Sequence, residues 1–132
     1  MGSRSMRAAV LALALLLLGA VPASGQKQVI KRLRFARASS SQIVKGRVRQ
    51  GGDRYLYFFK ARKGQRLTVR LVSDDGNAVC DVFSHGTFDA NPVVEGAVDW
   101  TGRLPEADAG EYSVEVRSTG GLARYVLEVV IR

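Results

Sequence analysis

Few side chains in this sequence have the chemistry for catalysis, and their spacing is unfavourable for it. The single histidine, His85, lies between Ser84 and Gly86, with Asp81 and Asp89 close in sequence. A serine nucleophile needs a strained turn and a base held by a separate segment, and an adjacent Ser-His pair on one short turn provides neither. We therefore expect His85 to be a solvated turn residue and not a catalytic base.

Two groups of acidic residues are also better explained as turns than as sites. Glu106, Asp108 and Glu111 could form a glycosidase pair, but they cluster beside a glycine turn, and the sequence predicts no apolar pocket that would raise one carboxyl pKa. Residues 74–77 lack the twelve-residue ligand spacing and the closing Glu of a calcium loop. The sequence thus predicts a protein that is not an enzyme, with no catalytic residue, no metal and no cofactor.

The cysteine and histidine counts exclude two further classes. One Cys cannot close an intramolecular disulfide, and one Cys with one His cannot supply the three or four ligands of a zinc site. Cys80 has the same strand parity as Ala78 and Val82. It is predicted to be a buried and unpaired small apolar residue, with an intermolecular disulfide as the alternative.

Residues 1–25 have the pattern of a Sec-type signal peptide. Arg4 and Arg7 precede a fourteen-residue apolar stretch, and small residues follow it at the expected cleavage site. Fourteen residues are fewer than the ~20 that a transmembrane helix needs, so no transmembrane anchor is predicted. We expect a single mature domain, residues 26–132, that is periplasmic or secreted.

Basic residues dominate the first half of the mature chain. The formal net charge is +8; residues 27–70 carry fourteen Lys or Arg against one acidic residue, whereas residues 71–132 carry four against eleven. This asymmetry predicts a basic surface that attracts anions over about 8–10 Å in physiological salt. An exported protein rarely meets nucleic acid, so the expected anions are cell-envelope polymers, lipid head groups or an acidic protein cleft.

Hydrophobic residues recur with a period of two throughout the mature chain, which is typical of half-buried strands. The clearest strands are expected over residues 66–71, 111–117 and 124–131, and weaker ones over 29–36, 42–49, 54–61, 78–83 and 93–100. Seven or eight short strands without a helical period predict an all-β fold, an antiparallel β-sandwich. Its core is expected to include Leu67, Val69, Leu71, Tyr112, Val114, Val116, Leu127 and Val129.

Two segments carry a recognisable motif. Gly46-Arg47-Val48 followed by YLYFFKARKGQRLTV (residues 55–69), and Leu104-Pro105 followed by GEYSVEV (residues 110–116), resemble the signature of bacterial pre-peptidase C-terminal-like modules and of the periplasmic inhibitors of goose-type (g-type) lysozyme. Residues 34–41 are similar to the segment that leads into the sandwich in the inhibitors. The fold itself explains some residues of the motif: Gly64 can adopt a positive φ in a turn, and Tyr112 could form a tyrosine corner.

The resemblance implies an inhibitor whose sandwich-end loops enter the glycan cleft of g-type lysozyme. Such a cleft is lined by carboxylates, which an arginine can pair with bidentately. The candidate loops are residues 50–54, 85–93 and 117–124, the last being expected as a hairpin loop with an arginine at each end. The expected partner-binding residues are Arg117, Arg124, Arg54, Ser118 and Thr119. Alternatively, Arg117 and Arg124 balance Glu111, Glu115 and Glu128 on the sheet surface.

A rival interpretation is a non-catalytic pre-peptidase C-terminal-like binding module. Lys45, Arg47 and Arg49 share parity on one strand and form a basic row with a spacing of about 6.6 Å. Arg66 and Arg70 would extend this basic face. A face of that kind suits anionic cell-envelope polymers, although an ordinary solvated face explains the same residues.

Overall fold

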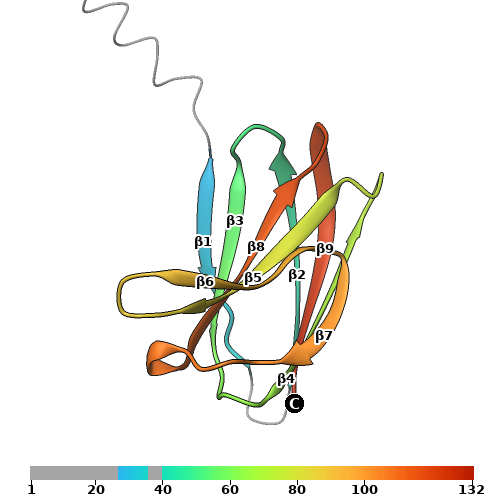
Figure 1. Cartoon of the computed structure of the whole chain (residues 1–132). Coiled ribbons are helices and arrows are strands. Elements are labelled where there is room, and N and C mark those ends of the chain that lie inside the picture. Colours follow the sequence, from blue (N-terminus) through green and yellow to red (C-terminus); the bar gives the residue numbers. More distant parts are fainter. Residues whose placement is uncertain (1–26, 36–39) are drawn as a thin grey trace, which may run out of the picture.

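The computed structural model describes residues 27–35 and 40–132, which form two β-sheets packed face to face (Figure 1). The five-stranded sheet contains, in spatial order, β1 (Gln28–Arg32), β3 (Arg54–Lys60), β8 (Glu111–Ser118), β5 (Ala78–His85) and β6 (Ala90–Ala97). The four-stranded sheet contains β2 (Ser41–Arg49), β9 (Leu122–Ile131), β4 (Arg66–Ser73) and β7 (Asp99–Arg103). The predicted β-sandwich is confirmed. The predicted signal peptide lies outside the described residues.

The packing between the sheets follows the alternation seen in the sequence. All eight residues predicted for the core are buried. Tyr57 and Phe59 of β3 add aromatic area, and the ring of Phe59 stacks on Tyr112 with the centroids 5.7 Å apart. The Tyr112 hydroxyl donates to the carbonyl oxygen of Pro105, which is the predicted tyrosine corner. Gly64 adopts a φ of 86° in the turn after β3, as expected.

Cys80 lies in this core. Its side chain is fully buried and unpaired, as predicted, and burial raises the pKa of its thiol to about 12. Within the part of the chain that the structure describes, no helix is long and apolar enough to cross a membrane.

Two strand predictions need correction. The strand expected over residues 93–100 is two strands in different sheets, β6 and β7. The chain changes sheet at Val98, whose carbonyl oxygen accepts the N–H of Leu71 on β4 at 2.7 Å. The strand expected over 29–36 ends at Arg32. It pairs with β3 in a parallel sense, since the intervening β2 belongs to the opposite sheet.

The loop expected over residues 85–93 is also shorter than predicted. β5 extends to His85 and β6 begins at Ala90, so only residues 86–89 connect them. Both strands continue their pairing to the His85–Ala90 partners at the end of the hairpin. The second candidate loop is therefore a tight turn.

Candidate functional site

Three connections meet at one end of the sandwich, which we call the loop end: residues 50–53, 74–77 and 119–121 (Figure 1). The backbone N–H of Gln50 donates to the carbonyl oxygen of Gly121 at 2.9 Å, and that of Thr119 donates to the carbonyl oxygen of Asn77, also at 2.9 Å. The Asn77 side-chain amide in turn donates to the carbonyl oxygen of Gly120 at 2.7 Å. These bonds tie the three connections into one unit, so two of the three predicted loops do lie together.

Ser118 and Thr119 shape this unit. The Ser118 hydroxyl donates to the carbonyl oxygen of Gly121 at 2.8 Å and accepts the N–H of Gly120 at 3.1 Å. Thr119 is exposed, and its hydroxyl donates to the carbonyl oxygen of Asn77 at 3.3 Å. Both side chains hold the connection between β8 and β9 in its conformation.

Arg117 and Arg124 lie on opposite sides of the molecule. Both side chains point outward, as their parity predicted, but β8 belongs to the five-stranded sheet and β9 to the four-stranded sheet. The connection between them is thus an arch from one sheet to the other, and the prediction of a hairpin is wrong. Outward from one sheet is the reverse of outward from the other, so one surface cannot present both guanidinium groups side by side.

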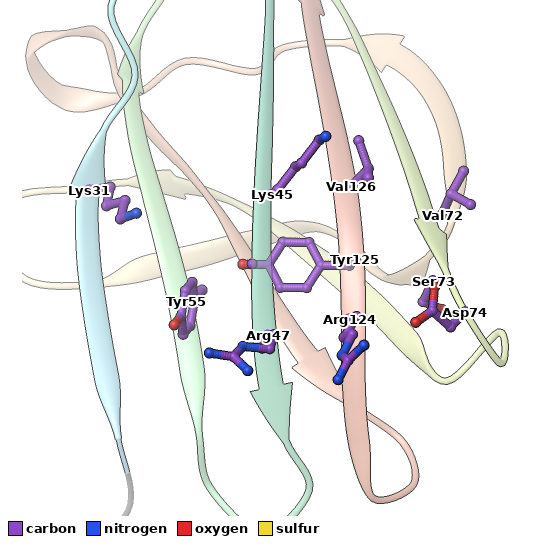
Figure 2. Close-up of a pocket in the computed structure, with 11 residues that line it drawn as sticks. Lys31, Lys45, Arg47, Tyr55, Val72, Ser73, Asp74, Arg124, Tyr125 and Val126 are labelled. Carbon is purple, nitrogen blue, oxygen red and sulfur yellow. The ribbon is translucent and has the colours of Figure 1, made fainter.

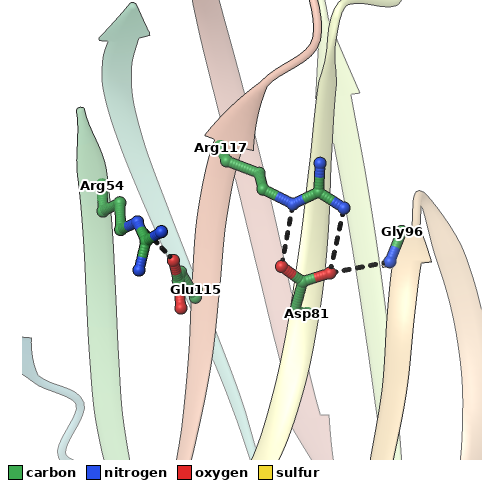
Figure 3. Close-up of polar contacts among 5 residues, drawn as sticks. All are labelled: Arg54, Asp81, Gly96, Glu115 and Arg117. Atoms are coloured by element: carbon green, nitrogen blue, oxygen red, sulfur yellow. Dashed lines mark hydrogen bonds and ion pairs between the residues drawn. The ribbon is translucent and has the colours of Figure 1, made fainter. Parts of the chain in front are cut away.

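Arg117 and Arg54 are occupied by carboxylates of the same chain (Figure 3). Arg117 donates through Nε to Asp81 Oδ2 at 2.9 Å, and Asp81 is only 7% exposed. The hydrogen bond to this carboxylate raises the pKa of the Arg117 guanidinium. Arg54 Nε lies 3.2 Å from Glu115 Oε1. These two ion pairs belong to the outer surface of the five-stranded sheet.

A third ion pair completes this surface. Arg32 on β1 donates to the carboxylate of Glu111 on β8, and this hydrogen bond raises the pKa of the arginine. We call the outer surface of the five-stranded sheet the paired face. Arg117 is balanced by an acid, as the alternative interpretation expected, but that acid is Asp81 and not one of the three glutamates. Arg124, for which the same was expected, has no ion pair among the described residues.

The outer surface of the four-stranded sheet is the predicted basic face. Lys45, Arg47 and Arg49 are exposed along β2, which forms one edge of the sheet. Arg124 on β9 is the direct cross-strand neighbour of Arg47. Among the described residues neither of these two arginines has an ion pair.

The far part of the basic face is partly neutralised. Arg70 lies between two acids, with its Nε 3.9 Å from Asp99 and its Nη1 3.6 Å from Glu128. Arg66, at the start of β4, is exposed opposite Arg103 of β7. Arg66 and Arg103 have no ion pair among the described residues, so uncompensated charge lies at both ends of this face: at Arg66 and Arg103, and nearer the loop end at Arg47 and Arg124.

A groove of about 850 Å³ opens beside Arg47 and Arg124, and we call it the basic groove. Basic side chains from three strands line it: Lys31 of β1, Lys45 and Arg47 of β2, and Arg124 of β9. One acidic residue, Asp74 in the connection after β4, lines it as well. Figure 2 shows Arg47 extending toward Tyr55 of β3, which lines the groove as well. The sequence placed Lys45 and Arg47 on one face, but the contributions of β1 and β3 depend on how the two sheets come together at their edges.

His85 is not the solvated turn residue that the sequence predicted. It ends β5, its Nε2 lies 2.7 Å from the hydroxyl oxygen of Ser113, and its ring lies 5.1 Å from that of Phe58. No carboxylate is hydrogen-bonded to His85 among the described residues, so this pair lacks the third member of a catalytic triad. The same residues contain no group of three or more His, Cys, Asp or Glu that could hold a metal ion.

The fold is similar to that of solved lysozyme inhibitors. Aeromonas hydrophila PliG, a periplasmic lysozyme inhibitor of g-type lysozyme, has a TM-score of 0.70 and 27% identity over 82% of this chain and 100% of that chain. Salmonella Typhimurium PliG, an inhibitor of the same class, has a TM-score of 0.59 and 24% identity over 82% and 100% of the two chains.

A second group of proteins shares the fold. The pre-peptidase C-terminal domain of a Bacillus anthracis collagenase has a TM-score of 0.51 and 10% identity over 82% of this chain and 99% of that domain. The chain matches no protein-family model and no curated protein. The expected resemblance to both groups is thus confirmed at the level of structure, with the PliG inhibitors the more similar of the two.

Proposed function

We propose that this protein is an exported inhibitor of g-type lysozyme and that its loop end blocks the glycan cleft of the enzyme. The observation that carries the proposal is the similarity to Aeromonas hydrophila PliG, which extends over the whole of that chain at 27% identity. The hydrogen-bonded loop end supports it, since a preorganised loop loses little conformational freedom on binding. An inhibitor of this kind would protect peptidoglycan from hydrolysis, and the predicted signal peptide would take it to the periplasm or beyond.

Among the candidate arginines, Arg124 is the best suited to contact the enzyme. It is exposed, lies beside the loop end, and has no ion pair among the described residues. A guanidinium group can form two parallel hydrogen bonds with a carboxylate of the cleft, which would block a catalytic acid. Arg117 and Arg54 would first have to share or leave Asp81 and Glu115, so they contribute less.

The test is lysis of a susceptible cell suspension by goose-, chicken- and invertebrate-type lysozymes, with and without the purified mature domain. We expect the goose-type enzyme to be slowed at micromolar inhibitor. If none of the enzymes is slowed, the resemblance concerns the fold alone.

The role of Arg124 can be tested in the same assay. Arg124→Ala should weaken inhibition by about 2–5 kcal/mol, which is roughly thirtyfold to several thousandfold, if the arginine meets a buried carboxylate. Arg66→Ala is the matched control, because Arg66 is exposed on the same sheet but begins β4, at the end of that strand away from the loop end. Equal inhibition by the parent and Arg124→Ala would mean that other residues anchor the enzyme.

Ser118 and Thr119 act through the shape of the loop end. Ser118→Ala removes the hydroxyl that bridges Gly120 and Gly121, so inhibition should weaken together with the rigidity of the arch. Hydrogen exchange at the amide of Gly120 would report that loss directly. Weakened inhibition with unchanged exchange would instead indicate direct contact of Ser118 with the enzyme.

A further inference from the structure

We propose that the basic groove binds an anionic polysaccharide, an extended glycan chain that carries carboxylate or phosphate groups. The site consists of Lys31, Lys45 and Arg47 above a floor that includes Tyr55, with Arg124 at the end nearest the loops. This activity goes beyond lysozyme inhibition and does not depend on it.

The charge of the groove is not required by the fold. Arg47 and Arg124 are direct cross-strand partners, and like charges in that position destabilise a sheet. Lys31 and Lys45 lie on edge strands, where charged residues prevent edge-to-edge aggregation. That explanation does not extend to Arg124, because β9 is an interior strand between β2 and β4. A bound anion would relieve the repulsion between the two arginines.

The shape of the groove favours a chain over a flat surface. The lining residues come from β1 and β3 of one sheet, from β2, β9 and β4 of the other, and from Asp74 just after β4, so the groove crosses the open edge of the sandwich (Figure 2). Four basic side chains outweigh the single carboxylate of Asp74. The charged head groups of a bilayer would meet only the rim. An extended chain can follow the groove, and consecutive anionic groups can meet Arg47 and Lys45, which lie about 6.6 Å apart along β2.

The remaining lining is suited to sugar rings. Tyr55 is half-buried and offers an aromatic surface with a hydroxyl group. Val126 and Val72 are exposed on the same sheet, with Val72 68% exposed, and they offer apolar contacts to the C–H faces of a sugar. Ser73 adds a hydroxyl to the lining. A site that recognised charge alone would not need these aromatic and aliphatic groups.

Titration calorimetry on the mature protein tests the proposal with defined probes. The probes are an oligogalacturonate for carboxylates, a phosphomannan oligomer for phosphates, polyglutamate of matched charge, phosphatidylglycerol vesicles and a neutral maltooligosaccharide. We expect saturable binding of at least one of the two anionic carbohydrate-type polymers, weakening as ionic strength rises. We expect weaker binding of polyglutamate and of the vesicles, and none of the neutral glycan.

Two double variants locate the site. K45E/R47E should weaken polymer binding by about tenfold or more, since two attractive charges become repulsive. R62E/K63E makes the same change of charge in the exposed turn after β3, at the opposite end of the sandwich, and should change binding by less than about twofold. Thermal unfolding of both variants shows whether they are folded.

Tyr55→Phe and Val72→Ser then test the sugar contacts without changing charge, and either should weaken binding of the glycan more than that of polyglutamate.

Four results would overturn the proposal: no binding of either charged polymer, polyglutamate or vesicles bound as tightly as the glycan, equal weakening by the two double variants, or no effect of the Tyr55 and Val72 substitutions. The lysozyme assay on the same preparations is independent of all four. A protein that slows lysozyme without binding polymer would disprove only the polysaccharide site, and the reverse result would disprove only the inhibition.

Discussion

Substitution of Gly46 by alanine tests how the floor of the basic groove is built. Gly46 lies on β2, and an added Cβ would stand 2.6 Å from Cζ and 2.9 Å from Cε1 of Tyr125. Carbon atoms in favourable contact are about 3.5–4.0 Å apart, so the ring would have to retreat by about 1 Å. Behind it the Tyr125 hydroxyl is hydrogen-bonded to the Tyr57 hydroxyl at 2.6 Å, and the Tyr55 ring stands edge-on at 6.0 Å. The phenol therefore has little room to move.

The cost has opposing contributions. Overpacking of a filled core costs about 1–3 kcal/mol, and leaving a buried hydroxyl unpaired costs about 1–3 kcal/mol more. Replacing a strand glycine returns about 0.5–1 kcal/mol, because alanine loses less backbone entropy on folding. We therefore expect Gly46→Ala to lower the free energy of unfolding by about 2–4 kcal/mol.

Urea unfolding of the mature protein measures this loss. Gly120→Ala is the control, since an added Cβ there has no heavy atom within 4 Å, and its cost should be below about 0.5 kcal/mol. Tyr125→Phe with Gly46→Ala should cost less than the sum of the two single changes, by about 0.5–3 kcal/mol, because both act on one hydroxyl. A loss below about 0.5 kcal/mol for Gly46→Ala, or strict additivity, would refute the packing of Tyr125 beneath Gly46.

Three other substitutions test charged and titratable groups. Arg47→Glu should raise the free energy of unfolding by about 0.2–1 kcal/mol at low salt, because repulsion from Arg124 becomes attraction. A lower free energy of unfolding than that of the parent, measured in urea, would contradict this. Burial raises the pKa of the Cys80 thiol in the folded protein from 9.0 to about 12. Between pH 9 and pH 12 only the unfolded chain loses this proton, so the free energy of unfolding should fall by up to about 1.4 kcal/mol per pH unit in that range. Cys80→Ala should lose that slope, and an unchanged slope would refute it. Asp81→Asn leaves Arg117 without its carboxylate and should cost about 1–2 kcal/mol in thermal unfolding, with an unchanged melting temperature as the contrary result.

The sandwich and its core were predictable because they follow from local periodicity. A strand that is half-buried repeats every two residues, and Leu67, Val69 and Leu71 show this without any knowledge of their partners. The tyrosine corner was also predictable from local sequence, since Tyr112 follows a glycine turn at the start of a strand. The break between β6 and β7 was not predictable, because at Val98 the chain leaves one sheet and bonds to Leu71 of the other, a partner distant in sequence.

The site was only partly predictable, because parity does not identify the sheet. Arg117 and Arg124 were correctly expected to point outward, but a two-residue glycine link suits a hairpin and an arch equally well. His85 was misplaced for a related reason, since Ser113 and Phe58, its partners, are distant in sequence. Contacts between distant strands decide such cases, and a period of two carries no information about them.

The contrast between the two outer faces of the sandwich has its origin in the order of the strands. β1 and β3 come from the basic half of the chain and lie next to β8 from the acidic half, so Arg32 and Arg54 find Glu111 and Glu115 as partners. β2 also comes from the basic half, but its neighbour β9 offers it only Glu128, which lies beside Arg70. The charge asymmetry of the sequence thus becomes an asymmetry between faces. A partner with carboxylates or phosphates finds free guanidinium groups on the four-stranded side, and there the cleft of a lysozyme and an anionic glycan would compete for Arg124.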